Sequence, residues 1–285
     1  SKGNNTIQKD YFLPSLNLKY NLNDKNSFRL GVSKTYTLPQ AKEISPYRYV
    51  GVNFNSQGNP NLKPSDNYNL DLKWDFNPTP TELISLTAFY KLIKNPISRI
   101  EVASAGGYLS YENIADKATV AGVEIEIRKN LFVRPVSNAA HGMNKLSLGL
   151  NGSYIYTNAK MPLATVTTGS QLEGAAPWIV NFDLSHNFTK GERSFVNTLV
   201  LNYVSDKIYT IGTQGYQDMM EQGVLTLDFV SQAKLNKHLS FNLKARNLLN
   251  PSYKLSRKAN ENGEKVILND YKKGINISLG VSCTF

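Results

Sequence analysis

Residues 275–285, which read INISLGVSCTF, alternate strictly between apolar side chains and small or polar ones. The apolar side chains occupy the odd positions, from Ile275 to Phe285. Successive side chains of a β-strand point to opposite faces of a sheet. The stretch therefore predicts a strand with one apolar and one polar face, continuing to the last residue.

The same stretch resembles the C-terminal signal of bacterial outer-membrane barrels. That signal consists of a polar residue, a glycine, an apolar residue and a terminal aromatic residue, which are here Ser278, Gly280, Cys283 and Phe285. The resemblance implies that these four residues form a barrel-assembly signal. It also implies a partner, the machinery that inserts such barrels into the outer membrane.

The composition argues against several other classes of protein. No stretch approaches eighteen consecutive apolar residues, so the sequence predicts no transmembrane helix. The one cysteine, Cys283, rules out an intrachain disulfide framework. The 32 Lys and Arg exceed the 22 Asp and Glu, but they are scattered without a dense run, which argues against a nucleic-acid partner.

Eleven segments have the two-residue period of a half-buried strand. In one of them Leu70, Leu72 and Trp74 alternate with Asp71 and Lys73. In the segment 194–204 apolar residues fall on both faces, which leaves its orientation open. The segments are 11–22, 27–37, 68–76, 83–93, 120–134, 144–157, 178–188, 194–204, 224–235, 239–247 and 274–285.

The connections between these segments are short and long in strict rotation. The short ones are 23–26, 77–82, 135–143, 189–193 and 236–238, and the long ones are 38–67, 94–119, 158–177, 205–223 and 248–273. Outer-membrane barrels have tight turns on the periplasmic side and long loops outside. The rotation therefore predicts an all-β fold, an antiparallel transmembrane β-barrel in the outer membrane of a Gram-negative bacterium.

Aromatic residues gather near both ends of the expected strands, as in the two interfacial girdles of such barrels. Those near the short turns are Phe28, Trp74, Phe76, Phe188, Phe195 and Phe285; those near the long loops are Tyr36, Tyr68, Tyr90, Tyr156, Trp178 and Tyr203.

The strand count predicts part of a larger barrel. An open sheet would leave two unpaired edges in lipid, and counting back from the last strand places residues 1–10 in an extracellular loop. Residues 1–285 are therefore interpreted as the C-terminal portion of an outer-membrane barrel domain.

Several elements resemble TonB-dependent outer-membrane receptors. Residues 58–65 (GNPNLKPS) match an NPNLKPE element, with Ser65 where Glu is usual. Residues 86–97 (LTAFYKLIKNPI) match an FY…IKNPI element, and Tyr111 to Asn113 with Gly122 to Glu124 match Y-x-N…GVE. Residues 245–250 (ARNLLN) match V-x-N-L-x-N/D. In this order the elements span about 50–285.

Such receptors are 22-stranded barrels with a plugged lumen, so the resemblance implies that this chain supplies strands 12–22. It implies as partners outer-membrane lipid, the N-terminal half of the barrel, a plug domain, TonB and a small-molecule chelate. The implied function is import of a scarce nutrient such as a ferric siderophore. The alternatives are a passive porin, a structural barrel of an envelope complex, or a polysaccharide importer, although the importers usually carry NPDLKWE.

The sequence predicts no catalytic, metal or cofactor site, and hence no enzyme. His141, His186 and His238 are isolated. Glu124 and Glu126 share one strand face and cannot oppose each other across a glycosidic bond. The candidate ligand-binding residues are aromatic or cationic residues of the long loops, which could hold an aromatic, anionic chelate. They are Tyr47, Arg48, Tyr49, Tyr209, Tyr216 and Arg257.

Overall fold

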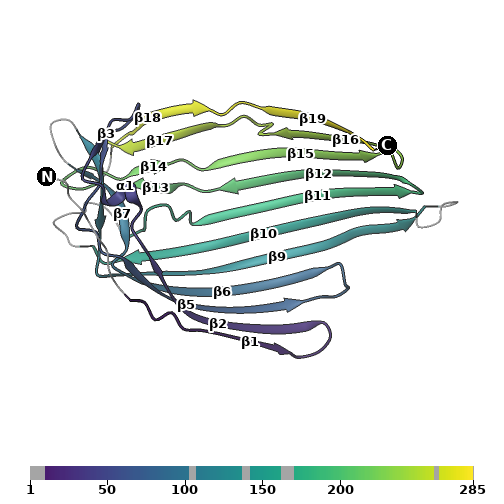
Figure 1. Cartoon of the computed structure of the whole chain (residues 1–285), viewed down its shortest axis with the longest axis horizontal. Helices are drawn as coiled ribbons and strands as arrows, with labels where there is room; N and C mark the ends of the chain where they lie inside the picture. The colour runs from purple at the N-terminus through teal and green to yellow at the C-terminus, as the bar shows by residue number, and fades with distance from the viewer. Residues whose placement is uncertain (1–9, 103–106, 137–141, 162–169, 260–262, 285) are drawn as a thin grey trace.

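The structure is a computed structural model that describes residues 10–102, 107–136, 142–161, 170–259 and 263–284. Its main feature is an antiparallel sheet of eleven strands, each paired with the next in the chain (Figure 1). The strands are β1 (Ser15–Asn21), β2 (Asn26–Thr37), β5 (Ser65–Phe76), β6 (Leu83–Lys94), β9 (Lys117–Pro135), β10 (Met143–Ala159), β11 (Trp178–Lys190), β12 (Arg193–Val204), β15 (Val224–Lys234), β16 (Leu239–Arg246) and β19 (Asn276–Cys283). Each corresponds to one expected segment, so the predicted strand order is confirmed.

The strand register gives the sheet one apolar and one polar face. Leu30, Leu72, Ala88, Val123 and Tyr154 are cross-strand partners in succession, so their side chains lie on one face. This face is the outward one, and the described girdle aromatics all lie on it by the same register. The pairing of β12 with β11 also settles the ambiguous segment, because Leu201 is the partner of outward-facing Phe182.

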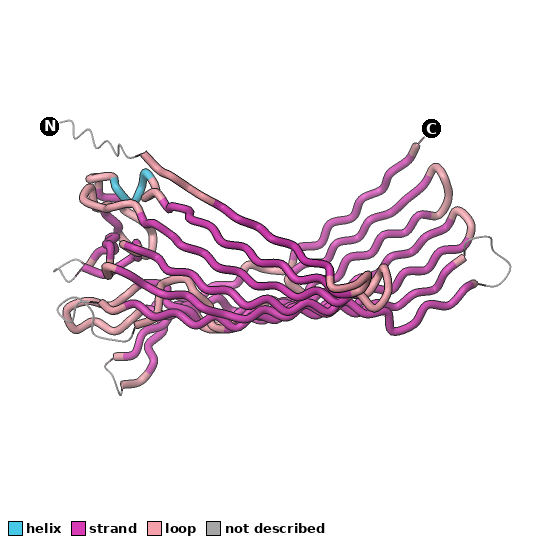
Figure 2. The backbone as a smooth tube through the Cα atoms, turned by 90° about the horizontal axis from the view of Figure 1, so that it is seen from below, coloured by secondary structure: helices cyan, strands magenta, loops and turns pink. Residues whose placement is uncertain are grey.

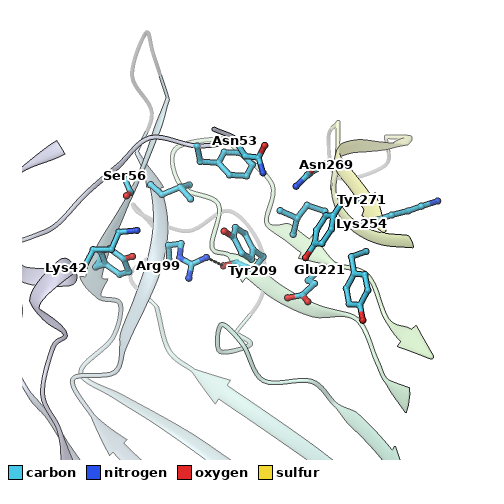
Figure 3. Close-up of a pocket in the computed structure, with 14 residues that line it drawn as sticks. Lys42, Asn53, Ser56, Arg99, Tyr209, Glu221, Lys254, Asn269 and Tyr271 are labelled. Atoms are coloured by element: carbon cyan, nitrogen blue, oxygen red, sulfur yellow. Dashed lines mark hydrogen bonds between the residues drawn. The ribbon is translucent and has the colours of Figure 1, made fainter. Parts of the chain in front are cut away.

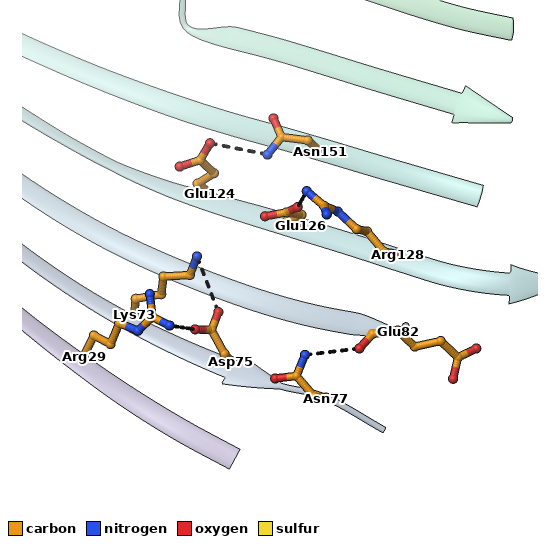
Figure 4. Close-up of polar contacts among 9 residues, drawn as sticks. All are labelled: Arg29, Lys73, Asp75, Asn77, Glu82, Glu124, Glu126, Arg128 and Asn151. Carbon is orange, nitrogen blue, oxygen red and sulfur yellow. Dashed lines mark hydrogen bonds and ion pairs between the residues drawn. The ribbon is translucent and has the colours of Figure 1, made fainter. Parts of the chain in front are cut away.

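The sheet is bent into a trough (Figure 2), with the polar side chains on its inner face. Asp75 lies 3.6 Å from Arg29 and 3.4 Å from Lys73, and Asn151 donates a hydrogen bond to Glu124 (Figure 4). Further charged residues share this inner face, and the full set is Asp71, Lys73, Asp75, Glu124, Glu126, Arg128, Asp228, Lys234, Lys244 and Arg246.

The long connections contain strands that the sequence did not predict. One small sheet consists of β3 (Arg48–Tyr49), β4 (Ser56–Gln57), β8 (Tyr108–Asn113) and β7 (Ile97–Val102), and the other of β13 (Lys207–Thr210), β14 (Met219–Glu221), β17 (Ser252–Lys258) and β18 (Lys265–Lys272). A bridge between Ile100 and Ile211 links β7 to the segment after β13. We call these two sheets, with the one-turn helix α1 (Ala41–Ile44), the cap.

The cap has a hydrophobic core of its own. Ile211 is 1% exposed and Ile100 5% exposed. The buried cluster comprises Ile100, Ile114, Ala115, Ala118, Ala159, Leu172, Ile208 and Ile211. Because these residues come from three different connections and the adjoining strand ends, the loops are packed against one another. Among the described residues, no helix is long and apolar enough to cross a membrane.

Candidate ligand-binding site

A cavity of about 730 Å³ opens between the two sheets of the cap (Figure 3). Its lining comes from α1, the segment before β4, the β7–β8 hairpin, β13, β14 and the β17–β18 hairpin. The residues are Lys42, Asn53, Phe54, Ser56, Arg99, Leu109, Tyr111, Tyr209, Glu221, Tyr253, Lys254, Leu255, Asn269 and Tyr271. The cavity thus lies where segments far apart in the sequence meet.

Arg99 is held rigidly at one wall of this cavity. Its guanidinium carbon lies 4.4 Å from the centroid of the Tyr209 ring, and its Nη1 donates to the Tyr209 backbone carbonyl at 3.4 Å. Glu173 accepts a hydrogen bond from the Arg99 backbone N–H and pairs with its Nη2 at 3.5 Å. Burial raises the pKa of the Glu173 carboxyl above its usual value, against the lowering effects of the Arg99 backbone hydrogen bond and charge.

The remaining charges of the cavity differ in how far they are neutralised. Glu221 pairs with Lys207 at 3.4 Å, and Lys254 pairs with Asp270 at 3.7 Å. Lys42 has no carboxylate partner in the described part of the chain, and its ammonium lies 5.5 Å from the centroid of the Tyr49 ring. An anion entering the cavity would therefore find in Lys42 a cation that is not already paired.

Aromatic rings supply most of the apolar surface of the cavity. Tyr253 and Tyr271 stack with their centroids 5.4 Å apart, and Phe54 lies 6.3 Å from Tyr209. Burial raises the pKa of the Tyr111 hydroxyl, so this group remains a neutral donor at physiological pH. The rings and donors together suit a planar, polar ligand.

The structure divides the six sequence-predicted ligand residues. Tyr209 lines the cavity. Tyr47, Arg48 and Tyr49 are exposed at and beside β3, outside the cavity lining, and Arg48 lies over the ring of Tyr108 at 5.5 Å. Their binding role stays a prediction.

Tyr216 and Arg257 belong to a separate contact. Arg257 forms an ion pair with Glu101 that ties β17 to β7, and its guanidinium lies 5.2 Å from the Tyr216 ring centroid. The Arg257 side chain is only 16% exposed, so its charge is largely engaged inside the cap.

Several cavity residues were not found from the sequence, among them Lys42, Arg99, Tyr253 and Tyr271. Tyr253 and Leu255 alternate with polar residues on β17, and this short period was an available signal. β18 has no such period, because Val266, Ile267 and Leu268 are consecutive, and both strands lie within the long connection 248–273.

The matched sequence elements hold the cap on the sheet. Asn113 accepts a hydrogen bond from the Lys63 N–H at 2.8 Å and donates to the Lys63 and Asn95 carbonyls, each at 2.9 Å. The Ser65 hydroxyl also donates to the Asn95 carbonyl at 2.8 Å. We call this contact the asparagine clasp. The clasp brings the elements NPNLKPS, KNPI and Y-x-N together, so these elements stabilise the structure of the cap. Of their residues, Tyr111 lines the cavity.

Two other elements have comparable structural roles. A Cβ on Gly58 would lie 2.3 Å from the Ser45 carbonyl oxygen, so only glycine allows this approach to α1. Asn247, at a positive φ of 57°, donates to the Gly274 carbonyl at 2.7 Å and thereby joins the end of β16 to the start of β19.

The proposed assembly signal lies on β19 and just after it. Ser278 and Gly280 are on its inner face and Cys283 on its outer face, according to their pairing with β16. Phe285 lies outside the described residues, as does His141. No group of three or more potential metal ligands occurs among the residues the structure describes.

Comparison with known proteins gives the family. Residues 1–248 match the family model described as TonB dependent receptor-like, beta-barrel. The chain belongs to this family. Its members are outer-membrane receptors for transport and not enzymes, in agreement with the sequence-based prediction.

The chain is 25% identical over 228 residues to the iron-regulated outer membrane virulence protein of Vibrio cholerae, and the match covers 76% of this chain and 32% of that relative. The chain therefore spans about a third of that relative.

Similar solved structures show the same fold. The ferric enterobactin receptor of Pseudomonas aeruginosa matches with a TM-score of 0.59 at 18% identity, covering 96% of this chain and 40% of that chain. The ferric yersiniabactin uptake receptor of Yersinia pestis matches with a TM-score of 0.61 at 16% identity, covering 96% and 37%. The copper transporter OprC matches with a TM-score of 0.63 at 14% identity, covering 95% and 40%.

Proposed function

We propose that the complete receptor imports a ferric siderophore by TonB-dependent transport and that the cap cavity is part of its outer binding site. The observation that carries the proposal is the cavity lining, which combines four tyrosines and Phe54 with the positioned Arg99 and with Lys42, which has no carboxylate partner among the described residues. Its volume of about 730 Å³ suits a small molecule. The iron-related names of the relatives support the same substrate class.

Residues 1–285 would supply strands 12–22 of the barrel. The first half of the barrel, the plug and the segment that binds TonB would lie outside this chain. The strand order and the inner face lined with ion pairs support this assignment, since a plugged lumen needs a polar wall.

Binding would combine ring stacking with charge attraction. A chelate with aromatic groups can lie against Tyr253 and Tyr271, and its negative charge can approach Lys42. Each cation–π or exposed charge contact contributes about 0.5–1 kcal/mol, so the site depends on several such contacts acting together.

The test uses the full-length receptor in an iron-starved host that lacks its own siderophore receptors. Uptake of a panel of ferric siderophores is measured with and without TonB. Lys42→Gln is expected to weaken binding of an anionic chelate by about threefold to fivefold. The matched control is Lys117→Gln, an exposed cation near the cap that does not line the cavity.

Uptake of at least one ferric siderophore that requires TonB and falls only in Lys42→Gln supports the proposal. Uptake that persists without TonB would indicate a passive porin. TonB-dependent uptake of oligosaccharides, with no siderophore transported, would indicate the polysaccharide importer.

A further inference from the structure

The apolar outer face of the sheet is interrupted near the periplasmic turns. His186 lies between Leu184 and Phe188 on the outward face of β11, and its cross-strand partner on β12 is Asn197. Asn197 is in turn the partner of Ser231 on β15. We call Asn144, His186, Asn197 and Ser231 the polar window.

The polar window is internally hydrogen-bonded but keeps free donors. His186 Nε2 donates to Asn144 Oδ1 at 2.8 Å, and the Ser231 hydroxyl donates to Asn197 Oδ1 at 2.7 Å. The side-chain amide nitrogens of Asn144 and Asn197 have no partner among the described residues. The register places these groups on the outward face. Each strand of the window has a neighbour on both sides, so the groups lie away from the edges of the sheet. Polar groups that face lipid are costly and point to a functional contact.

Three cations lie on the same face, two on the turn side of the window and one level with Asn144. Lys190 and Arg193 are cross-strand partners at the ends of β11 and β12, and both are exposed. Arg134 is the cross-strand partner of Asn144. None of the three has a carboxylate partner within the described ranges, and the nearby Glu192 pairs with Lys237 at 3.1 Å.

On the opposite side of the window the outward face of β10, β11, β12 and β15 is apolar, and the exposed Lys129 lies beside it on β9. Leu148, Leu184, Leu199 and Phe229 form one cross-strand row on the outward face, two residues farther from the turns than the row of His186. From the turns inward, the outward face of β11 and β12 presents Lys190 and Arg193, then the aromatic pair Phe188 and Phe195, then the donors His186 and Asn197, and then leucines. A glycerophospholipid presents its phosphate, ester oxygens and acyl chains in the order of these cations, donors and leucines.

We propose that this surface is a binding site for an anionic glycerophospholipid of the periplasmic leaflet. The lipid phosphate contacts Arg134, Lys190 and Arg193, while its ester oxygens accept hydrogen bonds from Asn144 and Asn197. The acyl chains lie along the apolar row. The site is separate from the cap cavity and does not depend on which nutrient the receptor imports.

Native mass spectrometry of the detergent-purified full-length receptor tests the site, with phosphatidylglycerol, phosphatidylethanolamine and phosphatidylcholine added in turn. A basic residue at a membrane surface changes affinity for anionic lipid by about fivefold. The affinity of the double variant Lys190→Gln with Arg193→Gln for phosphatidylglycerol is thus expected to fall by more than about tenfold, while its affinity for phosphatidylcholine changes little. The matched control, Lys25→Gln, removes an exposed charge of another short turn, between β1 and β2, away from this face.

A second variant keeps the test valid if charge removal disturbs insertion. Asn144→Leu with His186→Leu makes the window apolar, which suits the lipid-facing surface, and is expected to lower retention of all three lipids while the barrel stays folded. Unchanged lipid retention in both double variants, or an equal loss in Lys25→Gln, would overturn the proposal. Loss of a co-purifying protein with lipid retention intact would overturn it as well and assign the surface to a protein partner.

Discussion

The asparagine clasp is expected to control whether the cap stays closed on the sheet. Asn113→Ala removes three hydrogen bonds, made with the Lys63 N–H and with the Lys63 and Asn95 carbonyls. At about 1 kcal/mol each they would contribute about 3 kcal/mol. The clasp borders an open cavity of about 270 Å³, so water can reach the freed groups and reduce the net cost to about 2 kcal/mol.

A cost of about 2 kcal/mol raises the local opening equilibrium by about thirtyfold. Hydrogen–deuterium exchange of the full-length receptor should show this acceleration in residues 59–66 and 95–113, with exchange of β10 and β11 unchanged. Asn276→Ala is the control, because the Asn276 side chain makes no hydrogen bond in the described part of the chain. Equal exchange of residues 59–66 in wild type and Asn113→Ala would refute the role assigned to the clasp.

Three further predictions concern pH, packing and membrane exposure. Burial raises the pKa of the Glu173 carboxyl, so the contribution of this group to stability is fully present below its unfolded pKa and is lost as pH rises through its folded pKa. The melting temperature measured from pH 4 to 8 should therefore fall with rising pH in wild type, and it should fall less in Glu173→Gln. Gly122→Ala would place a Cβ 2.5 Å from a backbone oxygen and should cost about 1–3 kcal/mol in melting experiments, whereas Gly152→Ala, whose nearest contact is 3.7 Å, should be nearly neutral. In a Cys283→Ala background, a spin label at Leu72 should report lipid and one at Asp71 should report water. Labels at the outward positions Leu148, Phe182, Leu227 and Leu279 should likewise report lipid, and a label at the inward Asn242 should report water. The reverse pattern would exclude this register.

The large sheet could be predicted because each spanning strand separates lipid from the lumen. That separation imposes a strict two-residue period, as in Leu70 to Trp74. The start of β5 was missed by three residues because Ser65, Asp66 and Asn67 show no apolar alternation, yet they pair with the end of β2. Polar contacts hold these residues in place: Ser65 belongs to the clasp, Asp66 pairs with Lys34 at 3.7 Å, and Asn67 donates to the Thr37 hydroxyl at 3.0 Å.

The candidate site could not be predicted because it depends on contacts between loops. Arg99 and Tyr209 are 110 residues apart and meet only through packing of the cap. Tyr209 was identified by residue type alone. The residue type of Arg99 did not distinguish it from the other charged residues of the long connection 94–119. The asparagines of the matched elements, such as Asn59 and Asn113, hydrogen-bond backbone groups in the structure.

The bridge between Ile100 and Ile211 has a consequence for the exchange of loops between related receptors. Residues 97–102 and 207–221 share one buried interface. A graft of either loop alone would therefore pack a foreign loop against a native one in this core, where the side chains would not fit. A graft that keeps this core would then require co-transfer of both loops as a single module. Natural recombination within the family would be constrained in the same way, favouring crossovers outside the interval from residue 97 to residue 221.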